Sequence, residues 1–330
     1  MGDDFARLRT LLDDSDPDVR GMVAVALANI SGPQATDMLL ELAGDADSRV
    51  VCAAVQSLGA RGEKRSVPVL IRLMQRDETD VKCSALAALA QVADPQAFPA
   101  VVTAMFDVDD QVRRNATAAI GRLGDKRALE PLYEMLHDGY RWVRANAALS
   151  LKALADPGSA APLAMQLDEE DDDLVRGNLL MALMSCDGGR YPLLVTFLND
   201  PDEGEKTRVA AALAMPDAAS ALPEVSSEAM LTALARQVNA AGAPDEVRAA
   251  CAWALGRMPH RGSSIDALCD ALDDPYEWTV LYALESLALL KDVRAEGRIR
   301  AFRSMHEDDG KLVEHVDAAL KELEAVEARD

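Results

Sequence analysis

Six consecutive carboxylates, Asp168 to Asp173, form the densest group of potential ligands in the sequence. Such a run could bind a divalent cation, receive a basic partner, or lie as a solvated turn between helices. A calcium loop of the EF-hand type needs spaced acidic positions, a glycine at its sixth position and a glutamate at its twelfth, and this run lacks the glycine. We therefore expect no metal here, which leaves the solvated turn and the docking surface as interpretations.

Residues that could catalyse a reaction are scattered. Of the four histidines only His306 is followed by a glutamate, and we interpret His306 and His315 as exposed side chains rather than as a shared metal site. The sequence contains no glycine-rich nucleotide loop, no GxSxG nucleophile motif and no HExxH zinc motif. The five cysteines form no CxxC pair, which is typical of a reduced cytoplasmic protein. We expect no catalytic residues, no metal and no cofactor.

The charge of the chain restricts its partners. It has 330 residues, 34 basic and 56 acidic, and a formal charge of −22. Nucleic-acid affinity comes largely from basic side chains on phosphates, so we expect no nucleic-acid partner. No apolar run is long enough to span a membrane, and the first residues, MGDDFARLRTLLDD, do not form a secretory signal. The acidity indicates either a basic partner or a salt-adapted host.

A repeat of about 31 residues organises the whole chain. Most of its anchors belong to a Val-Arg type pair: Val19, Val50, Val81, Val112, Val143, Val175, Thr207, Val247, Thr279 and Leu312. A large apolar residue stands eight positions after each anchor: Leu27, Leu58, Leu89, Ile120, Leu151, Leu183, Met215, Leu255, Leu287 and Leu320. The first four intervals are each 31 residues, whereas the interval from Thr207 to Val247 is 40 residues and contains an irregular segment, 216–246.

Each repeat predicts a pair of helices. Apolar residues at offsets 0, 4, 7 or 8, and 11 from the anchor fall on one side of a helix, here called helix B. A second apolar helix, helix A, precedes it and carries a recurring proline in its first turn: Pro68, Pro99, Pro131, Pro162, Pro192 and Pro223. One pair is too small to bury its own apolar face, so neighbouring pairs must stack into a solenoid.

The best preserved unit, DDQVRRNATAAIGRLGDKRALEPL (109–132), resembles the HEAT-like repeat of the phycobilisome-lyase type. The resemblance covers nearly the whole chain. It implies an all-α, right-handed α-α superhelical solenoid of about ten helix pairs, continuous over residues 1–330. It does not fix the function, because the repeat serves lyase subunits, hydroxylases, nucleic-acid repair proteins and scaffolds. The hydroxylases bind iron through several His-Glu pairs, and this chain has only His306-Glu307.

The predicted turns between helix A and helix B are acidic. Four aspartates, Asp16, Asp47, Asp109 and Asp172, stand three residues before their anchors, where a carboxylate caps the free N–H groups of a helix. Because the turns of a solenoid stack along one edge, we expect an acidic rim. A basic residue follows most anchors: Arg20, Lys82, Arg113, Arg144, Arg176, Arg208 and Arg248. We expect each to bridge to a carboxylate of a neighbouring unit.

The exposed side of helix B is the first candidate for partner binding. At offsets 2, 3, 6 and 9, which point away from the core side, charged residues are few. Offset 3 places Asn115, Asn146 and Asn178 in successive units, and offset 6 places Leu149, Met181, Leu213 and Trp253. Amides that pair with an extended backbone, flanked by large apolar groups, are typical of a protein-binding groove. Packing between adjacent B helices would explain the same residues.

The rim is the second candidate. The motifs DGYRW (138–142) and DPYEW (274–278) place Tyr140, Trp142, Tyr276 and Trp278 at one loop position in two repeats, where they could contact a partner or cover the ends of adjacent helices. The acidic candidates on the rim are Asp168, Glu169, Glu170 and Asp171. The segment 215–228 breaks the repeat, either as a binding insertion or as a tolerated loop. We expect a non-enzymatic scaffold or adaptor for a protein or peptide; a lyase-type subunit that handles a tetrapyrrole is the alternative.

Overall fold

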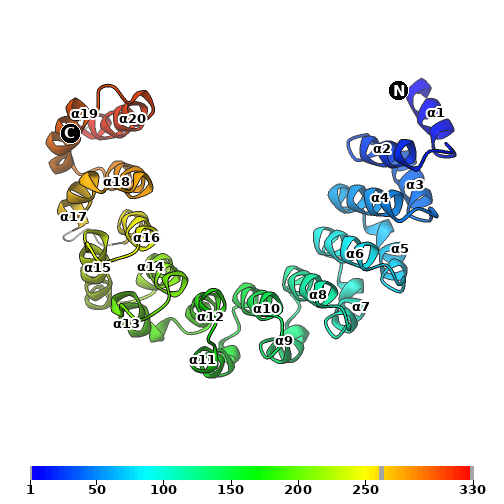
Figure 1. Ribbon diagram of the computed structural model, residues 1–330, viewed down its shortest axis with the longest axis horizontal. Helices are drawn as coiled ribbons and strands as arrows, with labels where there is room; N and C mark the ends of the chain where they lie inside the picture. The colour runs from blue at the N-terminus through cyan, green and yellow to red at the C-terminus, as the bar shows by residue number, and fades with distance from the viewer. Residues whose placement is uncertain (1, 260–263, 328–330) are drawn as a thin grey trace. The chain divides into compact units, whose positions relative to one another are not determined.

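The computed structural model describes residues 2–259 and 264–327, and in them every regular element is an α-helix or a short 3-10 helix. The chain divides into two compact units, unit 1 (Met1–Asp156) and unit 2 (Pro157–Asp330). Each unit consists of helix pairs packed in two layers, with the B helices side by side in one layer and the A helices in the other (Figure 1). The continuity of the solenoid from Asp156 to Pro157 stays a prediction.

Unit 1 contains five helix pairs. Its B helices are α2 (Pro17–Leu27), α4 (Ser48–Arg61), α6 (Thr79–Val92), α8 (Asp110–Leu123) and α10 (Arg141–Leu154). Its A helices are α1 (Gly2–Leu11), α3 (Pro33–Leu42), α5 (Val67–Leu73), α7 (Phe98–Ala104) and α9 (Leu129–Met135). The last three follow the 3-10 turns η1 (Lys64–Ser66), η2 (Pro95–Ala97) and η3 (Lys126–Ala128).

Unit 2 is built in the same way. Its B helices are α12 (Asp173–Cys186), α14 (Glu205–Ser220), α16 (Asp245–Leu255), α18 (Glu277–Leu290) and α20 (Gly310–Glu327). Its A helices are α11 (Ala160–Glu169), α13 (Pro192–Asn199), α15 (Glu224–Val238), α17 (Ser264–Asp270) and α19 (Glu296–Met305). The 3-10 turns are η4 (Pro157–Ser159), η5 (Gly188–Arg190), η6 (Ala271–Asp273) and η7 (Val293–Ala295).

The predicted all-α architecture of ten helix pairs is confirmed. All ten apolar residues that stand eight positions after an anchor are buried, nine of them completely and Leu320 with 6% of its surface exposed. Every repeat therefore buries one large apolar side chain at the same position, and these side chains form a regular part of the core.

Glycine allows adjacent B helices to approach closely. A Cβ on Gly59 would lie 2.8 Å from Cα of Ala88, and a Cβ on Gly121 would lie 2.9 Å from Cα of Ser150. Gly256 meets Ser286 in the same way. These glycines stand nine residues after their anchors, a position expected to point away from the core side. That expectation is wrong at these three positions, because offset 9 faces the next B helix.

The irregular segment 216–246 is mostly helical. Helix α14 continues to Ser220 with Pro216 inside it, and α15 extends from Glu224 to Val238. The break in the repeat at 215–228 therefore comes mainly from the lengthening of two helices around a short connection, 221–223, and its role as a binding insertion stays a prediction. Helix α20 runs from Gly310 to Glu327, and the last three residues of the chain lie outside the described part.

No helix within the described residues is long and apolar enough to cross a membrane. The five cysteines, Cys52, Cys83, Cys186, Cys251 and Cys269, are free thiols. Burial raises the pKa of Cys83 to about 11, so its thiol is protonated at neutral pH.

Candidate functional site

The aspartates three residues before the anchors cap the B helices. Asp16 and Asp47 each accept one hydrogen bond from the backbone N–H two residues later, at 2.9 Å. Asp109 and Asp172 each accept from two N–H groups of the first turn. All four predicted caps are confirmed, and each stabilises its helix by about 1 kcal/mol.

A second set of carboxylates joins neighbouring repeats; they stand five residues before the anchors, except Glu203, which stands four before Thr207. Arg20 donates to both oxygens of Asp45 at 2.7 and 2.8 Å, and Arg113 donates to both oxygens of Asp138 at 2.8 and 3.2 Å. The same contact recurs as Lys82–Asp107, Arg176–Glu203 and Arg248–Asp274. The predicted ladder is confirmed at these positions. It pairs most of the basic residues that follow an anchor with carboxylates of the predicted acidic rim.

The ladder shifts the acidities of its carboxylates. Burial alone raises the pKa of Asp138, but the hydrogen bonds from Arg113 and from the N–H of Tyr140 outweigh it and hold that pKa below the usual value. The hydrogen bond from Arg20 likewise lowers the pKa of Asp45. These aspartates are therefore ionised and paired at neutral pH.

Arg208 is an exception to the predicted ladder. The connection from α15 to α16, Asn239–Pro244, contains no carboxylate. The buried guanidinium of Arg208 instead donates to the carbonyl oxygen of Leu198 at 3.3 Å and to Oε1 of Gln237 at 3.1 Å. The prediction of a carboxylate partner is therefore wrong for this residue.

The six-carboxylate run does not form a single loop. Asp168 and Glu169 belong to the last turn of α11, and Asp173 is the first residue of α12. Glu170 is 6% exposed, and its Oε1 accepts the N–H of Asp172 at 3.1 Å, so its expected exposure on the rim is wrong. Asp168, Glu169 and Asp171 are exposed. Within the described residues, no group of three or more possible ligands could hold a metal ion.

The asparagines at offset 3 differ in their partners. Nδ2 of Asn146 donates to the carbonyl oxygen of Arg114 in the preceding B helix at 3.0 Å. Nδ2 of Asn115 donates to the carbonyl oxygen of Gln111 in its own helix at 2.8 Å. Asn178 has no hydrogen bond to the described residues. A contact between adjacent B helices, the second of the two interpretations, is thus found at Asn146, whereas Asn115 bonds within its own helix.

A pocket of about 660 Å³ opens on the B-helix face of unit 2. It brings together predicted residues from two separate groups, the groove candidates Met181, Leu213 and Trp253 and the rim candidates Tyr276 and Trp278. The other lining residues are Val209, Asp217, Glu246, Ala249, Ala250 and Tyr282. We call this the aromatic pocket. Four of its eleven lining residues are aromatic, in a chain with 4% aromatic residues.

The Trp253 side chain is held from one side. The guanidinium of Arg257 lies 4.1 Å from the centroid of its ring, and that guanidinium donates to the Trp253 carbonyl oxygen at 3.2 Å and to Glu285 at 2.6 Å. Trp278 is 52% exposed, and its ring centroid lies 5.9 Å from that of Tyr282. Large aromatic side chains are thus fixed at the surface and available for contact.

The aromatic pocket continues toward the end of the chain. A second pocket, of about 370 Å³, lies over α18 and α20 and shares Trp278 and Tyr282 with the first. Its wall includes Leu281, Leu284 and His315. Together the two pockets form a groove, here called the unit 2 groove, that follows the B helices from α12 to α20.

Besides Asn115 and Asn146, three predicted site residues lie in unit 1. Leu149 is 43% exposed on α10. Trp142 lies in the first turn of the same helix, with Arg114 and Arg141 at 5.4 and 5.0 Å from its ring centroid. The hydroxyl of Tyr140 contacts Nε2 of Gln111 at 3.3 Å. Trp142 and Tyr140 therefore contact side chains of their own unit.

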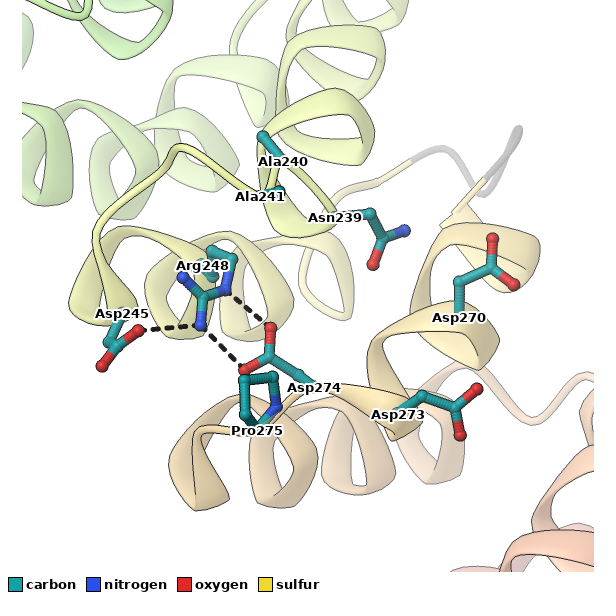
Figure 2. A pocket seen from close by; sticks show the side chains of 9 residues that line it. All are labelled: Asn239, Ala240, Ala241, Asp245, Arg248, Asp270, Asp273, Asp274 and Pro275. Carbon is teal, nitrogen blue, oxygen red and sulfur yellow. Dashed lines mark hydrogen bonds and ion pairs between the residues drawn. The ribbon is translucent and has the colours of Figure 1, made fainter.

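Another pocket, of about 520 Å³, lies at the loop edge of unit 2 beside Asn239 (Figure 2). Figure 2 shows Arg248 donating to Asp245 and to Asp274. Asp270 and Asp273 stand on the neighbouring turn. Arg248 already belongs to the ladder, so this pocket is part of the structural connection between neighbouring repeats.

Six of the eleven residues that line the aromatic pocket were not predicted from the sequence, among them Tyr282, Asp217 and Glu246. In α16 the lining positions Glu246, Ala249, Ala250 and Trp253 are three or four residues apart along one face, and in α14 Val209, Leu213 and Asp217 are spaced by four. These are the spacings of one helix face. The stripe that contains offset 6 therefore extends to offset −1 and offset 10, which would have identified Glu246 and Asp217.

The comparisons with known proteins agree with this architecture. The family described as HEAT repeats matches residues 5–90, 76–152 and 107–184, which together span more than half of the chain. The PBS lyase HEAT-like repeat matches residues 247–274. No curated protein matches the sequence.

Solved structures match the chain at low identity. Yeast importin-beta (Kap95p) is 13% identical, with a TM-score of 0.69 over 96% of this chain and 52% of that one. The Kap95:Nup1 complex is 15% identical, with a TM-score of 0.66 over 92% and 49%. The CpcE and CpcF complex of phycocyanin lyase from Nostoc is 18% identical, with a TM-score of 0.43 over 68% and 91%. The chain thus spans about half the length of Kap95p, and these likenesses show the fold alone.

Proposed function

The chain belongs to the HEAT repeat family, and we propose that it is a non-enzymatic scaffold or adaptor that binds a segment of a partner protein in the unit 2 groove. The observation that carries the proposal is the aromatic pocket, in which Met181, Leu213 and Trp253 lie beside Trp278 on a helix face open to solvent. A solvent-facing helix surface is usually polar, and an apolar patch with a polar rim is typical of an interaction site.

The types of side chain support a protein partner. Tryptophan and tyrosine dominate the binding energy of protein interfaces because they bury a large area and lose little side-chain entropy. Met181 adds a flexible thioether that adapts to irregular surfaces. The volume of the aromatic pocket, about 660 Å³, is enough for one or two side chains of a bound segment.

Kap95p gives a precedent at the level of the fold. It is found with Nup1 in one of the similar structures and with RanGDP in another. A HEAT solenoid therefore serves as a surface for other proteins. For this chain, we propose a protein or peptide partner, and no nucleic acid, on the basis of the groove and of the net charge of −22. The free cysteines support a cytoplasmic location.

A differential pull-down tests the proposal. Two baits, the wild-type chain and the variant with Met181→Asp and Trp253→Ala, are compared in native lysate. Circular dichroism and the melting temperature first show that the variant is folded. The matched control is Met165→Asp, because Met165 is 67% exposed on helix α11 and does not line the groove. We expect a partner that wild type and the control retain and the groove variant loses. Equal recovery by all three proteins would contradict the proposal.

The alternative, a lyase-type subunit, has one supporting observation, the match of residues 247–274 to the PBS lyase HEAT-like repeat. That segment includes Trp253 in the aromatic pocket. A chain with this function should change the visible absorption spectrum of a linear tetrapyrrole on mixing. A protein-binding scaffold should leave that spectrum unchanged.

A further inference from the structure

We propose that the partner segment is basic, and that one of its arginine side chains enters the aromatic pocket, stacks on the aromatic rings and pairs with Asp217 and Glu246. This inference rests on the proposed function, because it specifies the chemistry of the segment that the same groove binds.

The rings of the aromatic pocket provide the first argument. Trp253, Tyr276, Trp278 and Tyr282 line one cavity, and the planes of Trp278 and Tyr282 are tilted by 35°. The face of an aromatic ring carries negative charge density, so several rings around one cavity attract a cation. The attraction strengthens when the bound segment covers the pocket and excludes water from the cation.

The charged lining residues provide the second argument. The lining includes two carboxylates, Asp217 and Glu246, and no lysine, arginine or histidine. Asp217 is exposed and forms no ion pair or hydrogen bond with the described residues. Glu246 pairs with Lys206 at 2.5 Å, with both side chains about half exposed. A cation in the pocket would therefore meet one unpaired carboxylate and one that is only weakly engaged.

The aromatic pocket lies in the more acidic part of the chain. Burial, together with the nearby charge of Glu246, raises the pKa of Glu205 above its usual value. Residues 157–330 contain 33 acidic and 16 basic residues, a net charge of −17, whereas residues 1–156 contain 23 and 18, a net charge of −5. The aromatic pocket thus lies in the unit that carries most of the charge, which favours and steers a basic segment.

The chain itself shows the geometry that we propose for the partner's arginine. The guanidinium of Arg257 stacks on Trp253 and donates to the carboxylate of Glu285. A planar guanidinium makes both contacts at once, whereas a lysine ammonium is a strongly hydrated point charge. Arginine is therefore expected to bind more tightly than lysine.

The second pocket, over α18 and α20, indicates which kind of side chain of the partner lies next to its bound arginine. It shares Trp278 and Tyr282 with the aromatic pocket and is walled by Leu281 and Leu284 among others. A bound segment that continues over α20 would place an apolar side chain there. The inferred recognition element is thus an arginine with an apolar residue close to it.

A random 12-residue peptide library displayed on phage gives the probe. It is selected on the full chain, and peptides that also bind the Met181→Asp and Trp253→Ala variant are removed. The best groove-dependent peptide is synthesised, together with a copy in which each arginine in turn is replaced by citrulline, a neutral residue of almost the same shape. Affinities are measured by isothermal titration calorimetry on the wild-type chain, so this step needs no protein variant.

We expect selected peptides to contain an arginine near an apolar residue, and one citrulline replacement to weaken binding at least tenfold. The variant Asp217→Asn with Glu246→Gln should weaken the arginine peptide to a similar extent and leave the citrulline peptide unchanged. The control Asp168→Asn with Asp171→Asn removes the same charge from exposed positions outside the groove and should have little effect.

Three results would overturn the inference in distinguishable ways. Groove-dependent peptides without arginine, or with citrulline copies that bind equally well, would refute the cationic anchor and leave the groove as a binding site. A library that yields no groove-dependent peptide would contradict the proposed function as well. Loss of binding in the Asp168 and Asp171 variant alone would place the charge recognition on the rim.

Discussion

The guanidinium of Arg257 covers one face of the Trp253 ring at 4.1 Å from its centroid, and Glu285 holds that guanidinium at 2.6 Å. Arg257 stands one turn after Trp253 and Glu285 lies on the next B helix, so the indole is fixed between two neighbouring repeats. An aromatic anchor that is ordered before binding loses less entropy when a partner arrives. Because Arg257 and Glu285 fix the Trp253 side chain before binding, we place the binding site here.

Removing this support should weaken binding more than folding. In Arg257→Ala the Trp253 ring is free to change rotamer, and we expect the affinity for a groove-dependent peptide to fall several-fold. The unfolding free energy should fall by about 1 kcal/mol or less, because the pair with Glu285 is partly exposed. Calorimetric titration and the near-ultraviolet circular dichroism of tryptophan measure the two effects. An unchanged affinity with a changed tryptophan signal would show that the fixed ring is irrelevant to binding.

The close contact of α8 and α10 should tolerate no side chain at Gly121. A Cβ there would lie 2.4 Å from Oγ of Ser150, and that hydroxyl donates to the carbonyl oxygen of Thr117 at 2.7 Å. We expect Gly121→Ala to destabilise unit 1 by about 1 to 3 kcal/mol through overpacking. Thermal unfolding followed by circular dichroism measures this. Gly297→Ala is the control, because nothing lies within 4 Å of its Cβ position on helix α19.

The ladder carboxylates should stabilise more than exposed ones. Asp138→Asn leaves the guanidinium of Arg113 without its charged partner, at a site where the aspartate side chain is 8% exposed. We expect a loss of about 2 kcal/mol in the free energy of unfolding, as for other hydrogen bonds to charged groups. Asp37→Asn breaks the exposed pair with Arg65 and should cost about 0.5 kcal/mol or less. Equal urea midpoints for the two variants would contradict the ladder as a source of stability.

The pH dependence of that difference has a definite sign. The pKa of Asp138 is lower in the folded chain than in the unfolded chain, because Arg113 and the N–H of Tyr140 outweigh the effect of burial. Its contribution is therefore complete above the unfolded pKa, near 4, and is lost as the pH falls through the folded pKa. The difference in urea midpoint between wild type and Asp138→Asn should be constant from pH 7 to 5 and shrink below pH 4. A difference that grows on acidification would refute the assignment.

The repeat could be predicted from the sequence because the same apolar spacing recurs ten times. The anchors, the buried residues eight positions later and the four aspartate caps depend on local periodicity and first-turn chemistry, which one helix determines by itself. The carboxylate that pairs with each ladder arginine depends on the distance between the A–B loops of successive repeats. The sequence indicated a neighbouring carboxylate but not that it stands five residues before the next anchor, as Asp45 and Asp138 do.

The site could likewise be predicted only as far as the periodicity of single helices determines it. Offset 6 identified Met181, Leu213 and Trp253, and the repeated loop motif identified Trp278, but their meeting in one pocket depends on the packing of α12 to α18. The amide groups of Asn115 and Asn146 are used inside unit 1, which a pattern of exposed offsets does not show. The 40-residue interval was also ambiguous, because longer helices and a loop produce the same break in the repeat.

The central claim, that a partner protein occupies the unit 2 groove, is tested most directly by photocrosslinking. The photoreactive residue p-benzoylphenylalanine is placed at Asp217 in the aromatic pocket or, as control, at Met165 on helix α11. Irradiation in native lysate should give a specific covalent adduct of higher mass from position 217 and none from position 165. Adducts from position 165 alone, or equal adducts from both positions, would contradict binding in the groove.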